Sequence, residues 1–187
     1  MIRQAIKYIA DELNFLIGGS PPPVILGNIS RLDSGGESTE MQQKIVLTLV
    51  NIEEEKTLKN EPAYVKTGDK IEKRNPTLFL NLYILFSSAD DKYEMALNRI
   101  DSVVEVLQGK HVFTSANSDT GSYPGDVEKI ILDIYSLNFE QINHLWGTLG
   151  GKYVPSVLYK MRLLPIQNAT PEKVGVVEEI GTTENSN

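Results

Sequence analysis

The residues able to do acid–base or metal chemistry in this chain are few and scattered. It has two histidines, His111 and His144, and neither is followed by a second histidine four residues later. It has no cysteine, so a zinc site would need carboxylates for nearly all its ligands, which zinc takes less readily than imidazole or thiolate. We interpret both histidines as ordinary polar residues and expect no metal site.

Motifs for nucleophilic catalysis or phosphate binding are also missing from the sequence. Gly35-Gly36-Glu37-Ser38 does not supply the Gly-x-Ser-x-Gly of a nucleophile elbow. Gly147, Gly150 and Gly151 lie where a helix is expected to end, and glycines are common there as caps. We therefore expect no catalytic residue and no cofactor, and predict that the protein is not an enzyme.

Clustered carboxylates offer one alternative, because they suit calcium or magnesium. Glu53, Glu54 and Glu55 follow one another, but neighbours along a strand point to opposite faces and converge poorly. We interpret this run as a solvated strand end. Asp90-Asp91 has an equally simple interpretation, since acidic residues favour the start of a helix.

Length and composition predict one domain with a sizeable core. The chain has 187 residues, of which 41% are hydrophobic, and a formal net charge of −7. An acidic chain is a poor partner for nucleic acid or an anionic membrane, so we expect neither. The start of the chain mixes charged and apolar residues, which argues against a signal peptide and favours assembly in the cytoplasm.

Hydrophobic periodicity predicts three helices and several strands. Helices are expected over residues 2–17, 91–108 and 138–149, the last opened by an Asn138 and Gln141 capping box. Strands are expected over residues 24–29, 44–54, 77–87, 111–114, 127–137 and 156–163. The segments 30–43 and 115–125 are expected to be loops, and Thr67-Gly68-Asp69-Lys70 predicts the turn of a small hairpin inside the charged segment 55–76.

The same periodicity predicts which faces are buried. The second helix is expected to bury Tyr93, Leu97, Ile100, Val104 and Leu107, and the third Phe139, Ile142, Trp146 and Leu149. Strands 44–54 and 77–87 are apolar on both faces, so helices should cover one side and a further layer or another subunit the other.

These elements predict an α+β fold with a mostly antiparallel sheet flanked by helices. We expect one domain over residues 1–166, followed by a polar, flexible tail over residues 167–187.

Four segments together are more specific than any single motif. They are residues 47–65, 75–87, the helix start at Tyr93-Glu94, and 137–164 with its Trp146-Gly147 to Tyr159 block. In order and spacing they resemble an uncharacterised-domain family from bacterial contractile, phage-tail-like injection systems, in which the family member is the tail terminator, or cap. The resemblance covers about residues 1–166.

The resemblance implies a structural protein with a phage tail-terminator-like fold. Such subunits form a hexameric ring on the distal end of the inner tube, stop its polymerisation and hold the last ring of the sheath. The implied partners are other copies of the chain, the inner tube protein and the sheath protein. The particle assembled in the cytoplasm would then act inside the cell or be released from it.

We expect the segment from Glu53 to Arg74 to contact a neighbouring subunit or the tube. Its candidate residues are Glu53, Glu54, Glu55, Lys56, Lys59, Tyr64, Lys66, Lys70, Lys73 and Arg74. A short apolar patch in the tail is expected to add a strand to a sheath subunit, as β-augmentation does. Its residues are Val174, Val176, Val177 and Ile180.

Two other function classes remain open from the residues alone. One is a small-molecule or peptide-binding module with a pocket beneath the loop Ser115 to Gly125. The other is an enzyme that uses a carboxylate pair which the sequence does not locate.

Overall fold

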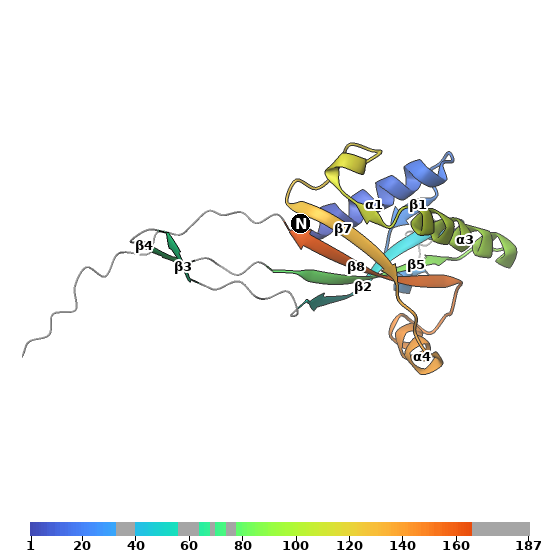
Figure 1. The fold of residues 1–187 in the computed structure, drawn as a ribbon. Coiled ribbons are helices and arrows are strands. Elements are labelled where there is room, and N and C mark those ends of the chain that lie inside the picture. The colour runs from blue at the N-terminus through green and yellow to red at the C-terminus, as the bar shows by residue number, and fades with distance from the viewer. Residues whose placement is uncertain (33–39, 56–63, 68–69, 74–77, 166–187) are drawn as a thin grey trace, which may run out of the picture.

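The chain forms a six-stranded sheet with helices on both faces (Figure 1). The computed structural model describes residues 1–32, 40–55, 64–67, 70–73 and 78–165, and only the backbone of 64–67 and 70–73. In spatial order the sheet consists of β1 (Val24–Leu26), β2 (Ile45–Glu54), β5 (Leu80–Ser88), β8 (Ser156–Pro165), β7 (Val127–Ile134) and β6 (Val112–Phe113). Every neighbouring pair is antiparallel except β1 and β2, which are parallel. This confirms the predicted α+β class.

Helices α1 (Ile2–Ile17) and α3 (Tyr93–Gly109) cover one face of the sheet (Figure 1). Every second residue of β5 and β8 points toward them, as strand geometry requires. The larger core cluster forms here and includes Ile9 and Leu13 of α1, Ile84 and Phe86 of β5, and Met161 of β8, all buried. We call this side the helix-covered face.

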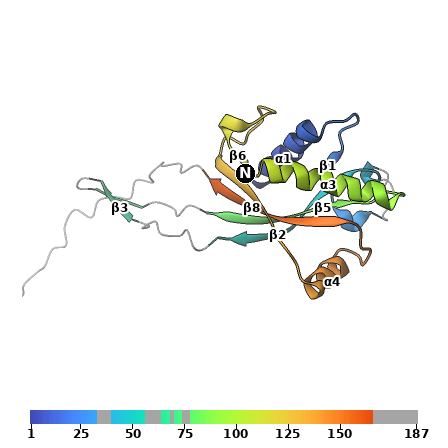
Figure 2. The same cartoon turned by 45° about the vertical axis from the view of Figure 1, so that its right-hand side comes forward.

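The opposite face of the sheet is covered only in part. Helix α4 (Phe139–Thr148) lies on this side, seen below the sheet in Figures 1 and 2. Trp146 packs there against a smaller buried cluster that includes Val46, Leu85 and Leu158. We call this side the α4 face; beyond α4 it carries polar side chains.

A separate two-stranded sheet follows β2. It consists of β3 (Tyr64–Thr67) and β4 (Lys70–Lys73), paired with Thr67 opposite Lys70. The expected hairpin is confirmed by this register, and Figure 1 shows it apart from the six-stranded sheet.

Several boundaries differ from the predictions. Strand β1 ends at Leu26, and Ile29–Arg31 forms a 3-10 helix because Asn28 caps it by accepting a hydrogen bond from the Ser30 N–H. Strand β7 ends at Ile134 rather than at residue 137. Strand β5 begins at Leu80 rather than at residue 77, since Leu78 and Phe79 are described but lie outside the strand; residue 77 and the tail from residue 167 lie outside the described part.

The predicted buried face of α3 is partly wrong. Tyr93 and Leu97 are exposed, whereas Ala96, Val103 and Leu107 are buried. Ala96 has no bulk beyond Cβ, so the helix can approach the sheet closely along this stripe, and the larger Tyr93 and Leu97 point to solvent. The helix is therefore rotated about its axis relative to the prediction. The prediction chose the large apolar residues as the buried face, and so it overlooked the small residue Ala96.

Two further expectations of burial are wrong. Phe139 is 92% exposed because α4 packs through later residues, with Trp146 buried and Ile142 and Leu149 half-buried. Strand β2 is not apolar on both faces throughout: Ile45 to Thr48 are buried, but Asn51 to Glu53 are exposed. The second half of β2 therefore has no cover among the described residues.

Candidate functional site

The predicted contact residues divide into three groups. Glu53 and Glu54 end β2, and Glu55 follows it directly. Tyr64, Lys66, Lys70 and Lys73 belong to the hairpin strands, where only the backbone is described. Outside the described residues lie Lys56, Lys59, Arg74, Val174, Val176, Val177 and Ile180.

Glu53 and Glu55 take part in a polar network on the α4 face. The Tyr83 hydroxyl donates to Glu53 at 2.7 Å, and the Asn81 side-chain amide donates to Glu55 at 3.0 Å. Lys160 Nζ lies 3.9 Å from the same Glu55 carboxylate. Glu54 pairs with Leu80 and so points to the helix-covered face, as expected for consecutive strand residues.

The network continues across the sheet through an ion pair between Arg162 of β8 and Asp133 of β7. Acidic and basic side chains thus alternate from β2 to β7 on a face that α4 leaves open. The hydrogen bond to the Glu53 carboxylate, with burial, raises the pKa of Tyr83 to about 12, so this hydroxyl stays a donor at neutral pH. The arrangement favours a polar protein contact over catalysis, because its charges are already paired.

The sequence leaves open a pocket beneath the loop Ser115 to Gly125, but the cleft described below lies elsewhere. That position holds the fully buried side chain of Glu12, which reaches from α1 into the loop. Its carboxylate accepts from the N–H groups of Asp119 and Thr120 at 2.8 and 2.9 Å, and from the Ser118 and Thr120 hydroxyls. Lys110 Nζ donates to it at 2.9 Å, so the loop is fixed to α1.

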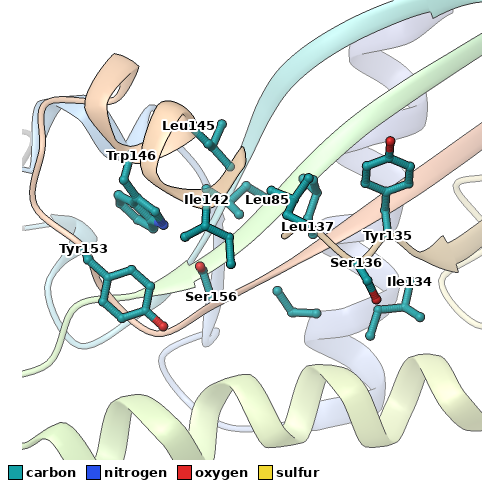
Figure 3. A pocket seen from close by; sticks show the side chains of 12 residues that line it. Leu85, Ile134, Tyr135, Ser136, Leu137, Ile142, Leu145, Trp146, Tyr153 and Ser156 are labelled. Atoms are coloured by element: carbon teal, nitrogen blue, oxygen red, sulfur yellow. The ribbon is translucent and has the colours of Figure 1, made fainter. Parts of the chain in front are cut away.

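An apolar cleft opens instead beside α4. Its volume is about 250 Å³, and it is lined by twelve residues from α4, the end of β7, the start of β8 and Leu85. Figure 3 shows Trp146, Ile142 and Tyr153 toward one end, and Tyr135, Ser136 and Ile134 toward the other. The Trp146 and Tyr153 rings meet edge to face, with centroids 5.6 Å apart.

Local sequence explains how α4 is held at this cleft. Asn138 and Gln141 form the predicted reciprocal capping box at its start. At its end Gly151, with a φ of 80°, donates its N–H to the Trp146 carbonyl at 2.7 Å. A left-handed backbone conformation favours glycine. The turn at Gly151 brings Tyr153 back onto Trp146. The cleft was not expected from the sequence; the one available signal was the pair Tyr135 and Tyr153 on either side of the predicted helix.

Chemistry that would suggest an enzyme is not assembled in the described residues. No three histidine, aspartate or glutamate side chains gather there as metal ligands, and His111 and His144 are exposed. None of the helices in the same residues has the length and hydropathy of a membrane span.

The fold is similar to that of two solved tube-terminating proteins. One is the sheath/tube terminator of an extracellular contractile injection system, PVC, in the extended state, with a TM-score of 0.56, 14% identity, and coverage of 100% of this chain and 64% of that chain. The other is the tube-terminating cap of the anti-feeding prophage, with a TM-score of 0.54, 12% identity, and coverage of 98% of this chain and 60% of that chain. The chain thus spans about three fifths of the length of either protein.

Family assignment comes from the sequence. A search of curated proteins found no match. The family model described as the Pvc16 N-terminal domain, however, matches residues 5–179, which is nearly the whole chain. The fold, with its curled six-stranded sheet and its likeness to terminators of contractile injection systems, agrees with that match. The chain belongs to the Pvc16 N-terminal domain family.

Proposed function

We propose that this chain is a cap subunit that forms a hexameric ring, ends the inner tube and anchors the terminal sheath ring of a contractile injection system. The observation that carries the proposal is the family match over residues 5–179. The full-length likeness to a sheath/tube terminator and to a tube-terminating cap supports it. In this role the protein is structural and needs neither a catalytic residue nor a cofactor.

The α4 face offers the kind of surface that a ring requires. A closed ring uses head-to-tail contacts, so each subunit needs two different complementary surfaces. The alternating charges of Glu53, Glu55, Lys160, Arg162 and Asp133 form one candidate, because a neighbour with complementary charges at the same spacing would be held in register by them. The apolar cleft beside α4 is a separate contact surface; it does not complement the charged one and would take an apolar segment of the neighbour.

The contact residues follow from the same proposal. Residues 53–74, including the hairpin β3–β4, contact the neighbouring subunit or the tube. Val174, Val176, Val177 and Ile180 contribute to the sheath contact. The particle assembles in the cytoplasm and acts outside the cell. The PVC system, whose terminator has a similar fold, is described as an extracellular contractile injection system.

The ring is tested by native mass spectrometry and negative-stain microscopy of the purified chain, together with binding to tube and sheath proteins of the same particle. The expected result is a hollow ring of six copies that binds both proteins. A monomer that binds neither protein would contradict the proposal. A ligand-dependent rise in melting temperature without rings would instead favour a binding module.

A further inference from the structure

The outer edge of β7 is open next to the cleft. Strand β6 pairs only with Ile130 and Ile131, and the His111 carbonyl accepts from the Leu132 N–H. The Tyr135 N–H points the other way and donates to Leu158 of β8. Because outward and inward groups alternate along an antiparallel strand, the backbone of Ile134 points outward. Among the described residues no strand pairs with that edge beyond Leu132.

The cleft begins where this edge is open. Ile134, Tyr135 and Ser136 belong to both features, and Ile134 is 60% exposed. Sites for small organic ligands usually measure roughly 300–1,000 Å³, so a cleft of about 250 Å³ suits one or two aliphatic side chains better. An open backbone edge beside a side-chain pocket is the arrangement that binds an extended peptide.

We propose that this edge and cleft bind residues 174–180 of a second copy of the chain, added as a strand beside β7. This segment, Val174-Gly175-Val176-Val177-Glu178-Glu179-Ile180, is β-prone and apolar within a polar stretch. In an extended strand Val174, Val176 and Ile180 share one side, so two of them can enter the cleft together. Val177 then lies on the opposite side.

The chain's own segment could reach this site only along a straight and fully extended path, which the fold obstructs. Strand β8 has 10 residues and leads from the cleft at Ser156 to Pro165, so its end lies about 30 Å away. The nine residue steps from Pro165 to Val174 span at most about 32 Å when fully extended, so Val174 could barely cover this distance in a straight line. Residues 166–173 would also have to turn back and pass around β6 and the loop fixed by Glu12. The segment of a second copy is not tied to Pro165 of the same chain, so this limit of length does not apply to it.

The inference rests on the proposed ring, because a second copy can offer its segment to the cleft only where copies of the chain assemble. It is also compatible with the proposed sheath contact. The added strand pairs with β7 through the backbone groups of one edge. The backbone groups of its other edge stay free to pair with a sheath strand.

Disulfide trapping in the full-length chain tests the inference. The natural chain has no cysteine. Seven double variants are made, each with Ile134→Cys and one further cysteine at one of the positions 174 to 180, so that each variant has a single defined thiol pair. Mild oxidation is expected to link separate chains into a ladder on non-reducing gels. The yield of disulfide-linked chains should alternate with a period of two along 174–180, because only one face of an added strand lies near Ile134. The yields at good and poor positions should differ by about tenfold.

The matched control replaces Ile134→Cys by Phe15→Cys, which is equally exposed at 61% but lies on α1. It should give a flat, low profile. A flat profile from Ile134→Cys, or links within one chain, would overturn the inference. Microscopy of the same samples separates this from failure of the proposed function, since rings without the alternating links leave the cap role intact.

Discussion

At the scale of single residues, Glu12 carries the most information about how the helix-covered face is built. Burial opposes ionisation of this carboxyl, but hydrogen bonds from Thr120, Lys110 and Ser118 outweigh it and lower the pKa from 4.5 to about 2. The Tyr8 ring, also fully buried, packs edge to face on Phe113 and Tyr123 beside the same loop. A charged residue on the apolar stripe of α1 was visible in the sequence, but its partners lie between 98 and 108 residues away.

Glu12→Gln should destabilise the protein by about 3 kcal/mol, measured by urea denaturation. The neutral amide loses the ion pair with Lys110 and presents donors to the N–H groups of Asp119 and Thr120. Asp11→Asn is the control, because its exposed pair with Lys7 contributes at most about 0.5 kcal/mol.

The same variant fixes the sign of a pH effect. Because the folded pKa of Glu12 lies below its unfolded value, its contribution is complete above about pH 5 and is lost as pH falls toward 2. The stability difference between wild type and Glu12→Gln should therefore shrink across that window. A constant difference would show that the charge of Glu12 does not stabilise the fold.

At the scale of elements, the packing of α4 predicts unequal effects on stability for substitutions at its two ends. Trp146→Ala should cost about 3–5 kcal/mol, because it empties the centre of the smaller cluster. Phe139→Ala should change the unfolding free energy by less than about 0.5 kcal/mol, since that side chain is 92% exposed. Comparable losses from the two variants would mean that α4 packs through its first turn.

Comparison of these elements with the sequence shows what periodicity can predict. The capping box at Asn138, the buried Trp146 and the alternating β8 were predictable because each depends on residues close in the chain. The exposure of Phe139, the rotation of α3 and the cleft beside α4 were not. They depend on where a helix lies across a sheet built from distant strands, and one sequence does not specify that position.

The hairpin β3–β4 should be separable from the fold. It pairs only within itself among the described strands, so replacing residues 56–77 by a short Gly-Ser linker should shift the melting temperature by no more than about 2 °C. The variant should lose binding to the tube or the neighbouring copy. Lys7→Glu, at an exposed position of α1, is the control for an unrelated change in surface charge. Unchanged binding by the linker variant would remove the hairpin from the interface.

At the scale of the whole molecule, the two faces of the sheet have different environments. The face under α1 and α3 is closed by a continuous core. The other is covered by α4 over one part and carries paired charges over the rest. Antiparallel sheets commonly have one face packed on the core and one facing water, so the open part of this face is accessible to the contacts that the proposed ring requires.

The most direct test of the cap assignment is cryo-electron microscopy of tube ends. Inner tube protein of the same particle is assembled with and without the chain, and the ends of single tubes are imaged. The expected result is a six-fold ring of this chain on one end of each tube, and tubes that stop growing once it is bound. Tubes of unchanged length with bare ends, at chain concentrations that saturate any binding, would contradict it.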